Sequence, residues 1–157
     1  MIVVLAVAPS TPSRHLAKKI QPLPAESWPL MWYNLAADDC VNSSNLRLGT
    51  DSTSAWPDVV TQVPCTQRHV AEICFSGNLW PTSARYPGDT AVSNTADAHC
   101  RAAFAAYVRI DISQSILSYD YWTPVGGSNW ELGARQVICV AYDPGVPLSA
   151  SVKGNRT

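Results

Sequence analysis

Residues 135–142 read RQVICVAY, a run whose apolar side chains fall on both faces of an extended chain. Successive side chains of a β-strand point to opposite faces. Each face here receives three residues: Val137, Cys139 and Ala141 on one, and Ile138, Val140 and Tyr142 on the other. A strand with two apolar faces is covered on both sides. The pattern therefore predicts a central strand over residues 135–142.

A helix is predicted upstream of this strand. Residues 86–89 read Tyr-Pro-Gly-Asp, a turn that places Asp89 as the expected N-cap. Apolar residues then recur at helical spacing and form one stripe: Ala96, Cys100, Ala103, Phe104, Tyr107 and Val108. Because Cys100 lies inside the stripe, we expect its sulfur to face the core.

Three further segments have strand patterns. Residues 59–63 form a β-type run that Pro64 ends, and residues 69–75 are its expected antiparallel neighbour. In the second run, Glu72 and Cys74 fall on the more polar face. Residues 148–153 alternate like a half-buried edge strand. The predicted fold class is α+β, a small antiparallel sheet packed against one main helix and stapled by disulfides.

Five cysteines are more than a cytosolic protein of this length usually has, and their separation along the chain suggests bridges formed outside the reducing cytosol. Any four cysteines can pair in three ways, and sequence alone does not choose among them. Cys100 on the helix and Cys139 on the central strand suit one bridge. Cys40 and Cys65 remain for a second, and Cys74 is the candidate free thiol. We predict these pairs, with the other connectivities open.

Length and composition limit the class of protein. The chain has 157 residues, enough for one domain with a core, and its 46% hydrophobic and 15% charged residues argue against disorder. A net charge of −1 gives no overall attraction to nucleic acid or anionic lipid.

The beginning of the chain has a different composition from the rest. Residues 1–8 are apolar, too few for a membrane span of about 20 residues, and resemble the end of a signal-peptide core. Prolines crowd the residues that follow. We expect residues 1–30 to be an apolar start and Pro-rich linker, the remnant of an export signal or anchor, with a short buried strand or a loose end as the alternative. Residues 31–154 would form the folded domain.

Several short segments, most of them around the cysteines, form a recognisable set when they are taken in chain order. They are Asp39-Cys40; Val63-Pro64-Cys65 with His69 and Glu72; Tyr86-Pro87-Gly88-Asp89; Cys100 with Phe104 and Tyr107; and Trp130, Gly133, Arg135, Cys139, Tyr142-Asp143-Pro144 and Leu148. Taken together, from about Asp39 to Gly154, this set resembles the septum-formation family of actinobacterial envelope proteins. The resemblance implies an exported α+β domain, usually tethered by an upstream membrane helix or lipid anchor, with no established enzymatic activity.

The chain departs from that family in three ways. We expect the upstream anchor to be missing from this chain. Asp38 stands where a glycine is common, and Arg68 precedes His69 where a proline is common. The first departure concerns localisation, and the other two concern local turn geometry.

The residue types present would allow two kinds of reactive site. Cys65, His69 and Glu72 are residue types that bind zinc, but a bridged sulfur is not a ligand, and strand alternation would place His69 opposite Glu72. Cys74 with His69, His99 or His15 as base would be a nucleophilic pair, but the sequence places no third, orienting residue. We therefore predict no catalytic residue, no metal site and no cofactor. The alternative is an exported thiol- or metal-dependent enzyme.

Aromatic residues are the candidates for contact with a partner. Tyr119, Tyr121, Trp122 and Trp130 fall in or near loops, where aromatic rings stack on sugars or anchor proteins, with core packing as the other use. Arg135 is expected to pair with a carboxylate and fix its loop. We expect a non-catalytic, envelope-associated or secreted binding or scaffold domain, and the resemblance links it to septum formation or cell-wall processes. Its partner would be an envelope protein or a cell-wall component, not nucleic acid, and it would contact the membrane only through a missing upstream anchor.

Overall fold

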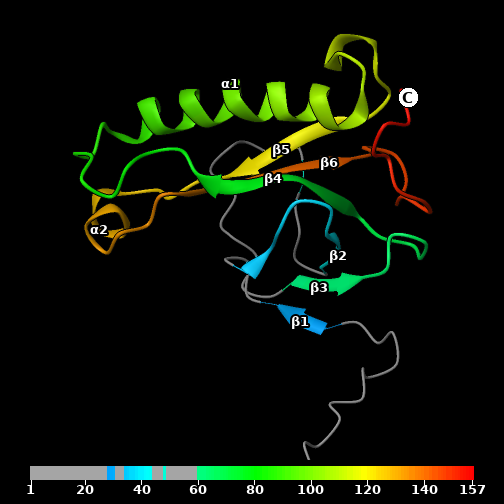
Figure 1. Cartoon of the computed structure of the whole chain (residues 1–157), viewed down its shortest axis with the longest axis horizontal. Helices are drawn as coiled ribbons and strands as arrows, with labels where there is room; N and C mark the ends of the chain where they lie inside the picture. Colours follow the sequence, from blue (N-terminus) through cyan, green and yellow to red (C-terminus); the bar gives the residue numbers. More distant parts are fainter. Residues whose placement is uncertain (1–27, 31–33, 44–47, 49–59) are drawn as a thin grey trace, which may run out of the picture.

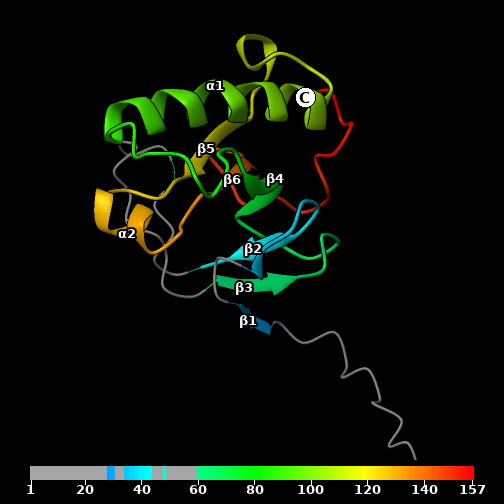
Figure 2. The same ribbon diagram turned by 60° about the vertical axis from the view of Figure 1, so that its left-hand side comes forward.

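The computed structural model describes residues 28–30, 34–43, 48 and 60–157. Its elements in chain order are β1 Trp28–Leu30, β2 Cys40–Asn42, β3 Val60–Val63, β4 Ala71–Asn78, α1 Asp89–Val108, the 3-10 turn η2 Ile112–Gln114, β5 Ser118–Trp122, α2 Gly127–Glu131 and β6 Gln136–Tyr142. The strands form one antiparallel sheet in the order β1-β3-β2-β4-β6-β5. In Figures 1 and 2, α1 lies over β4, β5 and β6, whereas β1, β2 and β3 lie away from it. The predicted fold class is confirmed.

Strand β6 is central and covered on both faces, as predicted. Val137, Cys139 and Ala141 belong to the apolar cluster under α1. Ile138, Val140 and Tyr142 belong to a second cluster with Val41, Val60, Ile73 and Trp122. The six alternating residues of β6 therefore join two cores through the sheet.

Helix α1 buries the predicted stripe except for Ala103, which is half-buried. Val92, Ala96, Cys100, Phe104, Tyr107 and Val108 are its buried residues. The N-cap prediction was wrong, because Gly88 with φ 93° occupies that position and Asp89 is the first helical residue. The Asp89 carboxylate instead accepts hydrogen bonds from the Gly126 N–H, at 2.8 Å, and from the Tyr86 hydroxyl. It therefore connects the start of the helix to the loop before α2.

The neighbour predicted for β4 was wrong. Strand β2 lies between β3 and β4, so β4 pairs with β2 and β6. A register shift between Ile73 and Phe75 also interrupts the alternation of β4. As a result, Ile73 lies in the second cluster, whereas Cys74 lies in the cluster under α1 and Phe75 packs against it. Cys74 is therefore buried instead of lying on a polar face, although it is the free thiol, as predicted.

Both predicted disulfides are present in the structure. Cys100–Cys139 joins α1 to β6 across 39 residues, and Cys40–Cys65 joins β2 to the turn after β3 across 25 residues. Each has a Cα–Cα distance of 5.2 Å, which is ordinary for a disulfide. Loops of this size imply stabilisation of about 3.5–4 kcal/mol per bridge in the chain-entropy model.

The C-terminal residues do not form the predicted edge strand. Leu148 and Val152 are buried as expected, but only Leu148 makes an isolated bridge, to His69. The Gly154 and Arg156 N–H groups instead donate to the carbonyls of Tyr107 and Val108, at 2.8 and 2.9 Å. Residues 148–156, called the C-terminal strap below, therefore satisfy backbone acceptors that the end of α1 leaves open.

Candidate functional site

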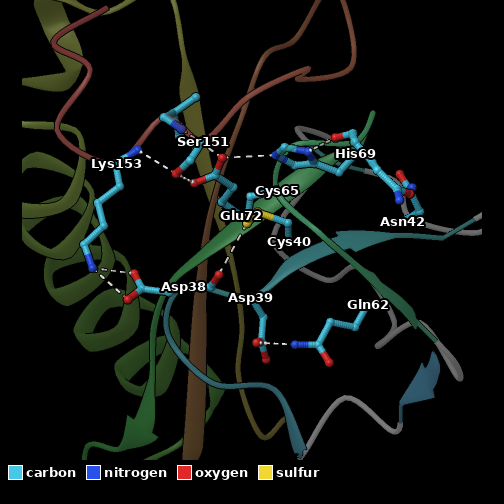
Figure 3. The surroundings of a disulfide bond; sticks show 12 residues. Asp38, Asp39, Cys40, Asn42, Gln62, Cys65, His69, Glu72, Ser151 and Lys153 are labelled. Carbon is cyan, nitrogen blue, oxygen red and sulfur yellow. Dashed lines mark hydrogen bonds and ion pairs between the residues drawn. A yellow bond between two sulfur atoms is a disulfide. The ribbon is translucent and has the colours of Figure 1, made fainter. Parts of the chain in front are cut away.

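A buried ion pair lies beside the Cys40–Cys65 disulfide. His69 ends the turn that follows Cys65, and Glu72 is the second residue of β4. Their side chains are fully buried, and His69 Nε2 lies 3.0 Å from Glu72 Oε1 (Figure 3). The prediction that the two residues lie on opposite faces was wrong, because β4 begins only at Ala71 and the alternation rule does not extend back to His69.

The Glu72 carboxylate accepts hydrogen bonds from four donors. Tyr107 of α1 and Ser151 of the C-terminal strap donate hydroxyl protons to Oε2, at 3.0 and 2.9 Å. The Val152 N–H donates to Oε1 at 2.8 Å, in addition to the His69 ring. A buried charge is costly unless it is paired and hydrogen-bonded, and here both oxygens are satisfied. The cluster thereby connects β4, α1, the turn and the strap.

The contacts and the pKa directions together favour one charge state for the pair. His69 Nδ1 lies 2.7 Å from the Gln67 carbonyl, which can only accept, so Nδ1 carries a proton, and Nε2 shares a proton with the Glu72 carboxyl group. Burial alone would lower the pKa of His69, but the hydrogen bonds to Glu72 and Gln67 outweigh it and raise the pKa. Burial alone would raise the pKa of Glu72, but the hydrogen bonds from His69, Val152, Ser151 and Tyr107 lower it. The raised pKa of His69 and the lowered pKa of Glu72 both favour an imidazolium paired with a carboxylate.

The disulfide lies against this pair because of the sheet register. Cys40 on β2 is the pairing partner of Glu72 on β4, and residues directly opposite each other share a face. The Cys40 sulfur, a His69 ring nitrogen and a Glu72 oxygen lie within 4.8 Å of one another, and all three residues are buried. Metal ions bind cysteine as the thiolate. The Cys40 sulfur in the disulfide is not a thiolate, so it is not a metal ligand in this form.

An exposed ion pair borders the cluster. Lys153 of the strap holds both Asp38 oxygens, at 2.8 and 2.7 Å (Figure 3). Both side chains are more than half exposed, so this pair contributes little to stability. Asp38 has φ 77°, a left-handed conformation that glycine adopts without strain. The structure thus explains why a glycine suits this position.

The predicted partner-binding aromatics do not lie together on one open surface. Trp122 and Trp130 are 1% and 3% exposed, and both pack within the protein. Tyr119 and Tyr121 are half-buried and pack against the cluster under α1, with the Tyr119 hydroxyl donating to Asp97 at 2.9 Å. Contact with a partner through these four residues stays a prediction, with the surface of the two tyrosines the more accessible part.

Arg135 fixes its loop through carbonyls instead of the expected carboxylate. Its guanidinium lies 3.8 Å from the centre of the Trp130 ring. It donates to the Trp130 and Ala134 carbonyls at 2.7 and 2.8 Å, and to those of Thr82 and Ala84 at 3.1 and 3.2 Å. The Trp130 indole N–H also donates to Ala84, at 2.8 Å. Arg135 therefore holds α2 against the loop before α1.

The free thiol has an environment unsuited to nucleophilic chemistry. Burial raises the pKa of Cys74 to about 12, so the thiolate is scarce at neutral pH. Cys74 and His99 both line a pocket of about 390 Å³. The His99 ring, however, packs edge-on against Phe75, with ring centres 4.3 Å apart. His15, the other candidate base, lies outside the described residues.

The fold and the cluster define the class of protein as a small α+β domain cross-linked by two disulfides and a buried ion pair. A family model described as "Septum formation" matches residues 35–139, and the chain belongs to this family. No curated protein and no solved structure matches the chain. The expectation for residues 1–30 falls largely on residues 1–27, which lie outside the described residues. In the described part of the chain, no helix combines the length and apolar character that a membrane crossing requires.

Sequence reasoning missed most of the donors around Glu72. Helical spacing predicts Tyr107 only as a member of the core stripe, and the alternation of residues 148–153 predicts only an edge strand. One signal was available, because Glu72 is an acidic residue between Ala71 and Ile73 in a strand. A carboxylate in such a position requires partners wherever the strand is covered.

Proposed function

We propose that this chain is a non-catalytic, extracytoplasmic domain that binds or scaffolds an envelope protein or a cell-wall component during septum formation. Membership of the septum-formation family supports the process. The two disulfides support the compartment, because such bridges persist in oxidising surroundings.

The main support for the proposal is that the polar atoms of the buried cluster bond to one another and to the backbone. His69, Glu72, Tyr107 and Ser151 have the residue types of a catalytic site, yet their polar atoms are directed at one another and at the backbone. The cluster therefore acts as a cross-link that fixes the relative positions of helix, sheet and strap. A rigid frame of this kind suits a domain that presents surfaces to a partner.

The end of the domain near α2 is the surface that we favour for this contact. Leu132 is 87% exposed directly after α2, and Val125 is 43% exposed before it. The loop beneath them is rigid because Arg135 and Trp130 fix it. Covering exposed apolar side chains lowers the free energy, and a rigid support reduces the ordering cost of such a contact.

Crosslinking followed by capture from the native envelope fraction tests the proposal. We expect an envelope protein or wall fragment to be recovered with the wild type, lost with Leu132→Asp and kept with Ile116→Asp. The second variant is a matched control, since Ile116 is 72% exposed and follows η2 instead of α2. Recovery of the same abundant, unrelated proteins with all three chains would contradict the proposal.

A further inference from the structure

The groups around the Cys40–Cys65 disulfide make a complete zinc ligand set once the disulfide is opened. Cys40, His69 and Glu72 already lie together in a buried cluster, and the Cys65 sulfur is bonded to Cys40. Two thiolates, an imidazole and a carboxylate are all zinc ligands. We propose that reduction of this disulfide converts the cluster into a closed Zn²⁺ site with Cys40, Cys65, His69 and Glu72 as its four ligands. This inference goes beyond the proposed function and does not depend on it.

The surroundings of His69 and Glu72 are those of metal ligands. His69 Nδ1 faces the Gln67 carbonyl at 2.7 Å, which leaves Nε2 as the nitrogen directed into the cluster. A zinc-binding histidine commonly donates its other N–H to a carbonyl or carboxylate in this way. Glu72 Oε2 accepts from Tyr107 and Ser151, and these bonds fix the orientation of the carboxylate while Oε1 faces His69.

The His69–Glu72 pair requires little rearrangement, whereas the Cys65 sulfur must move toward the other three ligand atoms, since it is not among the atoms that already lie within 4.8 Å of one another. Zinc bonds to nitrogen and oxygen are about 2.0–2.2 Å long, so a tetrahedral site separates these two ligand atoms by about 3.4 Å. His69 Nε2 and Glu72 Oε1 are 3.0 Å apart, so the pair opens by a few tenths of an ångström. The metal ion takes the position of the Nε2 proton. Four protein ligands leave no open coordination position, which makes this a structural site instead of a catalytic one.

Reduction is directed to this disulfide by its accessibility. Cys65 is half-buried, whereas Cys100 and Cys139 are fully buried. A thiolate of a dithiol reductant attacks Cys65 Sγ, the S–S bond breaks, and Cys40 leaves as a thiolate beside the His69 imidazolium, which stabilises it. The second thiol of the reductant then resolves the mixed disulfide and releases Cys65. Two electrons pass to the protein, and the reductant becomes a disulfide.

Zinc binding then exchanges protons for the metal ion. Cys40 binds as the thiolate already formed, and the Cys65 thiol and the His69 imidazolium each lose a proton, so binding is favoured as pH rises, as for other thiolate sites. The disulfide and the metal are mutually exclusive, because each uses the same two sulfurs. The cluster would thus remain cross-linked in both redox states, by a covalent bond in one and by Zn²⁺ in the other.

The first test uses the full chain with Cys65→Ser, which frees the Cys40 thiol and keeps three of the four proposed ligands, while Cys100–Cys139 stays oxidised. We expect this variant to bind one Zn²⁺ per chain and to show a thiolate-to-metal charge-transfer band when titrated with Co²⁺. The matched control is the double variant Cys40→Ser/Cys65→Ser, which lacks the same disulfide and should bind at least about 100-fold more weakly. Circular dichroism checks that both variants are folded. Equal affinity in the two variants would overturn the proposal.

A second measurement uses the wild-type chain and does not depend on those variants folding. After reduction with a phosphine, Zn²⁺ should slow alkylation of Cys40 and Cys65 at least about 10-fold, with little change at Cys74, Cys100 and Cys139. Uniform protection of all five cysteines, or no protection, would overturn the assignment of the site.

Discussion

Replacing Glu72 with glutamine tests whether the buried ion pair holds the fold together. Glutamine keeps the size of the side chain but removes the charge, and its amide nitrogen cannot accept the hydroxyl protons of Tyr107 and Ser151. The His69 proton also loses its counter-charge. Removing one partner of a buried ion pair lowers the free energy of unfolding by about 3–5 kcal/mol. Because the Tyr107 and Ser151 hydroxyls can turn and accept hydrogen bonds from the new amide, we expect Glu72→Gln to lower it by about 3–4 kcal/mol.

The assay is urea unfolding at pH 6, followed by tryptophan fluorescence, with Asp38→Asn as the matched control. The control removes the exposed Lys153 ion pair and should cost less than about 1 kcal/mol. A loss below about 1 kcal/mol for Glu72→Gln, equal to that of the control, would refute the view that the pair is a buried cross-link.

The difference in the free energy of unfolding between wild type and Glu72→Gln should depend on pH, and the two pKa shifts set the direction of that dependence. The pKa of His69 is raised in the folded protein. Its contribution to stability is therefore complete below the ordinary pKa of 6.5 and is lost as the pH rises through the pKa of the folded state. The pKa of Glu72 is lowered in the folded protein. Its contribution to stability is therefore complete above the ordinary pKa of 4.5 and is lost as the pH falls through the pKa of the folded state. The gap between wild type and Glu72→Gln should therefore be largest between pH 4.5 and 6.5 and shrink on both sides.

Three further predictions concern single residues. Asp38→Gly should stay within about 1 kcal/mol of wild type in urea unfolding, whereas Asp38→Val should lose more, because a β-branched residue is strained at φ 77°; equal stability of the two would contradict this. Cys74 should react with iodoacetamide at pH 8 at least about 100-fold more slowly in the folded chain than in urea, because its pKa is raised to about 12; similar rates would count against its burial. Arg135→Lys should cost about 2–3 kcal/mol and red-shift tryptophan emission, because lysine cannot donate to four carbonyls at once; an unchanged spectrum would show that the loop does not need it.

The parts of the fold that could be predicted are those set by local periodicity. The two apolar faces of β6 and the stripe of α1 follow directly from residue spacing, and they placed Cys100 and Cys139 within reach of each other. These two predictions succeed because alternation and helical spacing do not depend on distant parts of the chain. The pairing of Cys40 with Cys65 also requires Cys74 to be the free thiol, which is confirmed although the polar face predicted for Cys74 is wrong.

The parts that could not be predicted depend on contacts distant in sequence. The insertion of β2 between β3 and β4 is a choice of strand order, which local patterns do not specify. The shift between Ile73 and Phe75 moved Cys74 into the core under α1. The donors to Glu72 come from residues up to 80 positions away, so the buried cluster was invisible from the spacing of His69 and Glu72 alone.

The state of the five cysteines in intact cells tests the central claim most directly. Free thiols would be blocked in living cells with a membrane-permeable alkylating reagent, the protein denatured in excess reagent without reductant, and its peptides mapped. We predict a Cys40–Cys65 peptide, a Cys100–Cys139 peptide and an alkylated Cys74. Alkylation of all five cysteines would contradict both the disulfide framework and the extracytoplasmic location.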